Sequence, residues 1–316
     1  MHSGGYEGVI LAAGHGSRMG PFGELLPKPI VPICNKPLIV YQLEYMRALG
    51  IEDVFVVIGH LGHRITQTLG DGSPYGVRVH YVEQQQRLGI AHAVGQLERH
   101  ISRPFLLMLG DIYFEVPDLR RMIDIMEQES AAAVLAVKEE TDPEAVKRNF
   151  AVLLRPDGTV RRVIEKPRHV PNLLKGCGLY LFDMTIFDAI RRTPRTAMRD
   201  EYELTDSIQI LIDYEYSVRT AAVVEWDMNI TFIADLIDCC QRQLARRGVD
   251  NLIGKDCSVN GAVTLSHTVI GDRVTITKPC HLHRCVVLPD VVLDEGHDYH
   301  DRVITPAGAI KAGTDV

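Results

Sequence analysis

The chain has 316 residues, of which 46% are hydrophobic and 24% charged, with a formal net charge of −7 and a pI near 6.0. This length allows two domains and a large core, and the lack of a basic run argues against nucleic-acid binding. Runs of roughly 18 apolar residues, signal-peptide features and regular cysteine spacing are all absent. We therefore expect a cytoplasmic protein with reduced thiols and without a membrane or nucleic-acid partner.

Up to about residue 140, strand-like and helix-like segments alternate. Expected strands cover 9–13, 53–58, 77–82, 105–109 and 132–137, and expected helices cover 38–49, 63–69, 90–100 and 119–128. Alternation of this kind predicts an α/β fold in which helices cover a parallel sheet. The loops after the first and fourth strands, at 12–20 and 110–115, should then meet at one edge of the sheet.

The pattern changes between about 141 and 248. Segments 149–154 and 160–164 flank a turn at Pro156-Asp157-Gly158 and predict a hairpin, followed by a strand over 178–182. Two helices are expected near 205–213 and 232–246. We interpret this part as an antiparallel lobe that carries a second substrate.

A different period begins after residue 250. Aliphatic residues recur every six positions, with one skipped residue, at Ile253, Val259, Leu265, Ile270, Ile276, Leu282 and Leu288. This spacing predicts a short hexapeptide left-handed β-helix of roughly two coils. The predicted domains are 1–248, with a first part up to about 140 and a second lobe over about 141–248, and 249–316, whose last residues, 294–316, show no period.

The stretch from Leu11 to Gly20, followed by Lys28, is the most informative part of the chain. It comes after a short apolar strand and has glycines at 14, 16 and 20, so backbone N–H groups can surround phosphate oxygens. The two cations that follow, Arg18 and Lys28, suit a polyanion such as a triphosphate.

Three further side chains have the chemistry of a nucleotide site. Asp111 ends an apolar strand and is a candidate Mg²⁺ ligand. The second ligand is expected at Asp227, with Asn229 as the alternative. Gln84 can offer a donor and an acceptor to a nucleobase.

Together these segments resemble the sugar-1-phosphate nucleotidylyltransferases, also called NDP-sugar pyrophosphorylases. The resemblance rests on the 11–29 segment, on Gln84 with the Gly89–Ala93 segment, on Gly110-Asp111, on Glu165-Lys166-Pro167, and on Arg199 with the 201–206 segment. The last of these, and the hexapeptide tail, bring the chain nearest to glucose-1-phosphate thymidylyltransferase-like members. The implied fold is a Rossmann-like, mixed but mostly parallel sheet.

The resemblance implies a transfer in which the phosphate of a sugar 1-phosphate attacks the α-phosphorus of a nucleoside triphosphate and pyrophosphate leaves, with Mg²⁺ as cofactor. Arg18 and Lys28 are the implied catalytic residues. The nucleotide would be bound by Leu11, Ala12, Ala13, Gly14, His15, Gly16, Ser17, Arg18, Gln84, Gly89, Ile90 and Ala91. The sugar phosphate would be bound by Asp111, Ala151, Glu165, Lys166, Gly178 and Arg199.

The substrates stay open at this point. UTP or dTTP with a hexose 1-phosphate is favoured, and a guanylyltransferase for an unusual sugar or cyclitol phosphate is the alternative. Ile112 stands where the thymidylyltransferase branch usually has a polar residue, which predicts a more apolar sugar-facing edge. A homodimer or homotetramer is expected.

Other functions are weaker interpretations of the same residues. A dinucleotide-binding oxidoreductase needs an acidic residue after the second strand, where this chain has Gly59-His60. A non-catalytic subunit would not need to retain Lys28 and Asp111. Acyl transfer by the tail needs more coils, and zinc binding by the Cys and His residues between 280 and 300 conflicts with the inward position of Leu282.

Overall fold

The computed structural model describes residues 5–14, 16–197 and 200–313. The contacts divide the chain into two compact units. Unit 1 comprises 1–14 and 42–227, and unit 2 comprises 15–41 and 228–316. The predicted boundary near residue 248 thus lies within unit 2, and residues 15–41 belong to the same unit as the tail.

Unit 1 is built on one nine-stranded mixed sheet with the order β10-β9-β11-β6-β1-β4-β5, in which β8 also pairs with β11, and β12 with β8. Its strands are β1 (Glu7–Ala12), β4 (Asp53–Ile58), β5 (Arg78–Glu83), β6 (Phe105–Leu109), β8 (Ala133–Glu139), β9 (Phe150–Leu154), β10 (Val160–Glu165), β11 (Leu174–Phe182) and β12 (Val218–Ala221). The five strands expected in the first 140 residues are all present. β1, β4, β5 and β6 run parallel to one another, as the alternating sequence predicts.

The expected hairpin forms β9 and β10, which continue the same sheet through antiparallel pairing with β11. β11 also runs antiparallel to β6 and to β8. The strands of the predicted second lobe therefore extend the first sheet. A short strand after β6, β7 (Ile112–Glu115), and the strand β12 were not predicted from the sequence.

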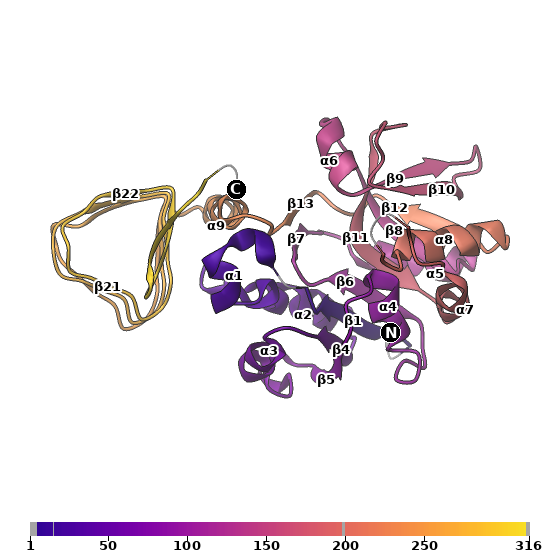
Figure 1. The fold of residues 1–316 in the computed structure, drawn as a ribbon, viewed down its shortest axis with the longest axis horizontal. Helices are drawn as coiled ribbons and strands as arrows, with labels where there is room; N and C mark the ends of the chain where they lie inside the picture. Colours follow the sequence, from indigo (N-terminus) through magenta and orange to yellow (C-terminus); the bar gives the residue numbers. More distant parts are fainter. Residues whose placement is uncertain (1–4, 15, 198–199, 314–316) are drawn as a thin grey trace. The chain divides into compact units, whose positions relative to one another are not determined.

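Helices pack on both faces of the sheet (Figure 1). One face carries α4 (Ile90–Gly95), α7 (Thr185–Arg192) and α8 (Leu204–Asp213), and the main core cluster lies between these helices and the strands. α5 (Arg120–Glu129) packs on β8, β11 and β12. Side chains alternate along a strand, so Val9 points into the main core cluster while Gly8 faces Met46 of α2 (Leu38–Ala48). α3 (Gly62–Leu69) and α6 (Pro143–Arg148) complete the unit.

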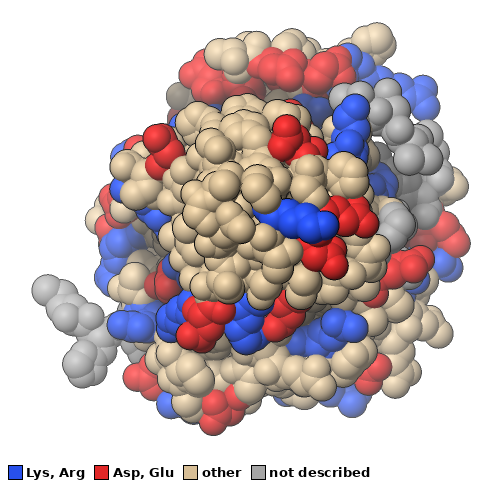
Figure 2. Space-filling view, turned by 90° about the vertical axis from the view of Figure 1, so that its left-hand side faces the viewer, with Lys and Arg blue, Asp and Glu red and all other residues tan. Residues whose placement is uncertain are grey.

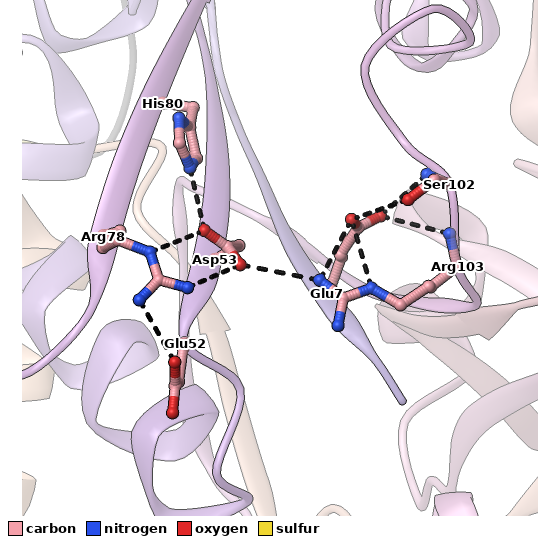
Figure 3. Close-up of polar contacts among 7 residues, drawn as sticks. All are labelled: Glu7, Glu52, Asp53, Arg78, His80, Ser102 and Arg103. Atoms are coloured by element: carbon pink, nitrogen blue, oxygen red, sulfur yellow. Dashed lines mark hydrogen bonds and ion pairs between the residues drawn. The ribbon is translucent and has the colours of Figure 1, made fainter. Parts of the chain in front are cut away.

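Ion pairs join the starts of three neighbouring strands in unit 1 (Figure 3). Arg78 donates two hydrogen bonds of 2.9 Å to the carboxylate of Asp53, which also accepts one of 3.0 Å from His80. Arg103 contacts Asp53 at 3.5 Å and the buried Glu7 at 3.3 Å. Because these residues lie at the amino ends of β1, β4 and β5, they hold the edge of the sheet opposite the carboxyl ends, where ligands bind in α/β sheets.

Unit 2 begins with short helices, η1 (Ser17–Met19), α1 (Pro21–Leu25) and η2 (Lys28–Ile30), and with a hairpin of β2 (Pro32–Ile33) and β3 (Lys36–Pro37). The hairpin packs on the long helix α9 (Ile233–Arg247), and the thiol of Cys34 points at the backbone carbonyl of Cys240 at 3.5 Å. In addition, Asn35 donates a hydrogen bond of 2.8 Å to the carbonyl of Ile270. The 15–41 segment is thus fixed against C-terminal residues of its own unit.

The tail forms the predicted β-helix, whose stacked coils are drawn in yellow in Figure 1. Its three sheets follow the orders β14-β17-β20-β23-β24, β15-β18-β21 and β16-β19-β22. The strands are β14 (Leu252–Ile253), β15 (Ser258–Val259), β16 (Thr264–Ser266), β17 (Val269–Ile270), β18 (Thr275–Ile276), β19 (His281–His283), β20 (Val286–Val287), β21 (Val292–Leu293), β22 (Tyr299–His300), β23 (Arg302–Thr305) and β24 (Gly308–Lys311).

The coil repeat corrects one part of the predicted period. Ile253 pairs with Ile270, and Ile270 pairs with Val287. Each coil therefore takes 17 residues, one fewer than three hexapeptides, and the missing residue falls at the same corner of every coil. Val287 rather than Leu288 consequently takes the repeating position. The segment without a period adds β22 and β23, and β24 returns antiparallel along β23. A closing antiparallel strand covers an edge that would otherwise expose unpaired backbone groups.

The surface of the face in Figure 2 is mixed in charge. Lys and Arg are interspersed with Asp and Glu around a largely uncharged centre. No helix in the described ranges is long and apolar enough to cross a membrane. All seven cysteines are thiols, as the irregular spacing predicts.

Candidate functional site

The end of β1 in unit 1 is closely surrounded by glycine loops. The Gly110 N–H donates to the carbonyl of Leu11, and a side chain at Gly110 would come within 2.7 Å of that oxygen. A side chain at Gly59 would come within 3.0 Å of the Ala13 carbonyl. Leu11 is half-buried, Ala12 and Ala13 are buried, and Gly14 is exposed, so that even a Cβ atom there would have no described atom within 4 Å. The backbone can therefore approach a ligand at Gly14 without a side chain in the way.

The rest of the glycine stretch belongs to unit 2. Gly16 and Gly20 have φ values of +69° and +57°, which glycine adopts without strain. The Gly16 carbonyl accepts a hydrogen bond from Met19, and this turn leaves Arg18 exposed. Lys28 is buried, with its side chain next to Gly16. His15 lies outside the described residues, and the side chain of Ser17 is not described.

Asp111 follows β6 on a loop that a buried amide holds in place. Gln42 of α2 donates hydrogen bonds of 2.9 Å to the carbonyls of Leu109 and Ile112, on either side of Asp111. The side chain of Ile112 is only 1% exposed, so the predicted apolar substrate edge is not formed by this side chain. Sequence reasoning missed Gln42, because only the folded loop shows which carbonyls it reaches.

Gly178, in β11, has no side chain and so leaves room for the side chain of Ile112. It has a φ of +68°, and a side chain there would come within 2.6 Å of the Ile112 Cδ1 atom. Glycine is thus required at this position for its backbone conformation and for packing. Its predicted contact with sugar phosphate stays a prediction.

The predicted base-binding residues come together with the 201–206 segment. Gln84 follows β5 and is 6% exposed. Gly89 has a φ of +104°, and any side chain there would come within 2.5 Å of the Tyr202 carbonyl. That carbonyl accepts a hydrogen bond from Ala91, while Tyr202 N–H donates to Leu88. Ile90, half-buried, begins α4 within this contact.

The predicted sugar-phosphate residues occupy different environments. Glu165 accepts a hydrogen bond of 3.3 Å from Thr205 and pairs with Lys166 at 3.7 Å. Lys166 has a φ of +41° and a side chain that is 46% exposed, so its ammonium group is accessible to an anion. Ala151 is fully buried within β9. Arg199 lies outside the described residues.

A buried charge cluster around Asp227 was not predicted from the sequence. Lys175 Nζ lies 2.8 Å from each carboxylate oxygen of Asp227 and 2.7 Å from Glu140 Oε1. Burial lowers the pKa of Lys175, but the two carboxylates outweigh burial, so the net shift of this pKa is upward. The second cation, Lys138, lies 3.3 Å from Glu140 and 4.0 Å from Asp227. An ammonium group thus already neutralises the carboxylate that was the favoured second metal ligand.

Asn229, the alternative ligand, differs from Asp227 in that its side-chain oxygen is not paired. It ends β13 (Trp226–Asn229), and its buried side-chain oxygen Oδ1 has no hydrogen-bond partner among the described residues. A buried carbonyl oxygen in this state is costly unless it binds a cation, a donor or a water molecule. Within the described ranges, groups of three or more His, Cys, Asp or Glu that could hold a metal ion are absent. A Mg²⁺ site that uses one or two protein ligands together with substrate phosphates is compatible with this composition.

The β-helix places the Cys285 thiol and the His side chains of the tail in different environments. Cys285 is buried and its thiol points at the carbonyls of His283 and Tyr299, both at 3.3 Å. The rings of His281, His283 and His300 instead lie beside one another, with centroids 5.7–6.4 Å apart. In the part of the chain that the structure describes, these side chains form no group that could hold a metal ion.

Comparison with known proteins identifies the fold and the chemistry. A family model described as nucleotidyl transferase matches residues 7–227, which is most of the chain. The chain belongs to the nucleotidyl transferase family. The match ends in β13, so it includes Gln84, Asp111, Glu165, Lys166 and Asp227 and leaves the β-helix outside.

Two curated relatives match a larger share of the chain than the family model does. The low-salt glycan biosynthesis nucleotidyltransferase Agl11 of Haloferax volcanii is 33% identical over 272 residues, covering 83% of this chain and 73% of the relative. A glucose-1-phosphate thymidylyltransferase of Streptomyces griseus is 34% identical over 287 residues, covering 85% and 77%. A solved UDP-glucose pyrophosphorylase in complex with UDP-glucose has a TM-score of 0.66 at 22% identity, covering 77% of this chain and 99% of that one.

These matches confirm the family resemblance, the mixed α/β fold and the nucleotidyltransferase class. The structural neighbour supports the fold alone, because its sequence identity is low. The individual site residues, the metal and the substrates stay predictions.

Proposed function

We propose that the protein is a sugar-1-phosphate nucleotidylyltransferase that joins UTP or dTTP to a hexose 1-phosphate and releases pyrophosphate. The observation that carries this proposal is the placement of the motifs. The Leu11–Gly14, Gln84–Ala91 and Gly110-Asp111 segments lie at the carboxyl ends of the parallel strands β1, β5 and β6, where ligands bind in α/β sheets. The relative named as a glucose-1-phosphate thymidylyltransferase supports a thymidine or uridine nucleotide.

Charge neutralisation is the main task in this reaction, because two anions must approach each other. Arg18 is exposed and always protonated, and we assign it to the β- and γ-phosphates. Lys28 is assigned to the α-phosphate. Its buried side chain is fixed next to Gly16, which limits the reorganisation needed when charge develops there.

The acceptor needs orientation but no base, since a sugar phosphate is already ionised at neutral pH. We assign Lys166 to its phosphate, because the exposed ammonium group is held near Glu165 on a constrained backbone. The reacting phosphate oxygen can then attack in line with the leaving pyrophosphate. Arg199 is retained as a second predicted phosphate ligand.

Asp111 stays one predicted Mg²⁺ ligand, and of the two alternatives for the second ligand we favour Asn229 over Asp227. Oδ1 of Asn229, which has no partner among the described residues, can coordinate a cation at no cost in existing contacts. Asp227 would first have to release Lys175. When bound, Mg²⁺ would neutralise phosphate charge. Asp227 is then a structural partner of Lys175.

Pyrophosphate release tests the proposal. The purified protein is incubated with Mg²⁺, one of UTP, dTTP, GTP, CTP or ATP, and one of a panel of sugar 1-phosphates and cyclitol phosphates. We expect release with UTP or dTTP and a hexose 1-phosphate. Release with GTP and a cyclitol phosphate alone would favour the guanylyltransferase alternative, and no release with any pair would favour a non-catalytic subunit. Light scattering of the same sample tests the predicted dimer or tetramer.

A further inference from the structure

The side chain of Gln84 is held by a histidine on the next helix. Gln84 Nε2 lies 3.0 Å from His92 Nδ1, and on the other side of the ring Gln96 Nε2 lies 3.3 Å from His92 Nε2. The ring of Tyr202 stacks beside that of His92 with an interplanar angle of 25° and a centroid distance of 6.4 Å. His92 thus contacts three other side chains, one of which is Gln84.

The protonation state of His92 decides what this contact does. A neutral imidazole has one N–H donor and one acceptor nitrogen. Only one of its two nitrogens can accept, so Gln84 Nε2 donates to Nδ1 when the ring proton is on Nε2. The amide of Gln96 must then turn its oxygen toward Nε2, in place of the nitrogen that faces the ring here. Burial lowers the pKa of His92, which favours the neutral ring at neutral pH.

We propose that His92 is a positioning residue that fixes the orientation of the Gln84 amide and thereby selects the nucleobase. With Nδ1 as acceptor, the nitrogen of the amide must face His92, because a flipped amide would place two acceptors against each other. The Gln84 oxygen and its remaining N–H then have fixed positions. This inference rests on the proposed role of Gln84 in binding the base.

A fixed amide distinguishes bases by the order of donors and acceptors on their edges. Uracil and thymine carry a ring N–H beside a carbonyl, and guanine has the same pair. Cytosine and adenine carry a ring acceptor beside an amino group, so they need the amide flipped. Since the flip would cost the hydrogen bond to His92, the site should favour the ring N–H class.

The test compares nucleotide pairs that differ in this pattern. UTP and CTP differ in it alone, whereas GTP also carries a 2-amino group that ATP lacks. Equilibrium binding of UTP against CTP, and of GTP against ATP, is measured for the wild type and for His92→Phe and His92→Gln. His92→Phe keeps a ring beside Tyr202 but removes the acceptor, whereas His92→Gln keeps a polar partner for the amide. We expect His92→Phe to lose about tenfold in discrimination within the preferred pair, and His92→Gln to retain most of it.

Two further measurements separate positioning from general damage. His100→Phe is the matched control, since His100 is an exposed histidine whose ring lies near Phe55, and it should leave discrimination unchanged. With saturating nucleotide, kcat of His92→Phe should stay within about twofold of the wild type while KM for the nucleotide rises about tenfold.

A wild-type binding ratio in His92→Phe, or an equal loss in the control, would overturn the inference. Selective nucleotide binding that is lost in His92→Phe, with no pyrophosphate release in the wild type, would instead refute the proposed transfer reaction and support base selection through His92.

Discussion

Removal of the Lys175 ammonium group should destabilise unit 1 strongly. In Lys175→Met, Asp227 and Glu140 keep their negative charges in a place where their side chains are only 4% and 11% exposed. The three carboxylate oxygens that lie 2.7–2.8 Å from Nζ lose their donor at once. Water cannot easily replace that donor at this depth, so the cost comes mainly from the carboxylates left behind.

Breaking a buried ion pair by removal of one partner typically costs about 3–5 kcal/mol. Lys138 remains 3.3 Å from Glu140 and 4.0 Å from Asp227, and can compensate for part of the lost charge. We therefore expect about 3 kcal/mol, the lower end of that range. Asp227→Asn added to Lys175→Met should recover part of the loss, because the double variant buries one uncompensated charge fewer.

Urea unfolding followed by circular dichroism measures these differences as shifts in the transition midpoint at constant slope. Lys147→Met is the control, because Lys147 forms an exposed pair with Glu144 and should cost at most about 0.5 kcal/mol. The reasoning is refuted if Lys175→Met unfolds within about 0.5 kcal/mol of the wild type, since the buried carboxylates would then have found other partners.

The other predictions concern catalysis, metal dependence and pH. Lys28→Ala should lower the rate of pyrophosphate release at least about 10²-fold through loss of transition-state stabilisation, and near-normal turnover would remove its catalytic role. Asn229→Ala should raise the Mg²⁺ concentration for half-maximal turnover at least about tenfold. Asn229→Asp should not raise it. Equal Mg²⁺ concentrations for the wild type and Asn229→Ala would exclude Asn229 as a ligand. The hydrogen bonds from Arg78 lower the pKa of Asp53 from 3.8 to about 2, so this carboxylate stabilises the fold above pH 4 and loses that effect as the pH falls through 2. With allowance for partial exposure, Asp53→Asn should lower the free energy of unfolding by about 1–2 kcal/mol at pH 7. It should also flatten the dependence of stability on pH between about pH 5 and 2. The unfolding midpoint, measured as a function of pH in this range, would show both effects.

The parallel core of the sheet was predictable because buried strands such as 53–58 are continuous apolar runs bounded by turn residues. The β-helix was predictable from its six-residue period. The sequence showed only one skipped residue, and this was not enough to reveal that every coil lacks a residue at the same corner. The helix α6 was missed although the sequence carries its start signal. It follows Asp142, whose side chain accepts the Glu144 N–H, and has Pro143 at its first position.

The site was predictable only where a local motif carries it. The Gly89 conformation and the Asp111 position follow from short segments, and family resemblance supplied the roles. The pair of Lys175 with Asp227 joins residues 52 apart in the sequence, and no local pattern marks either residue as a partner of the other. The contact between His92 and Gln84 is closer in sequence, but it depends on how the loop between β5 and α4 folds back.

The hairpin that follows Lys28 has a practical consequence for anyone who shortens this protein. Cys34 and Asn35 rest on α9 and on the second coil of the β-helix. A deletion that begins after residue 227, although it would keep the whole family match, would strip away the support on which residues 15–41 fold. Arg18 and Lys28 would remain in such a fragment but would lose the C-terminal residues that their segment packs on, so the tail supports the segment predicted to bind phosphate.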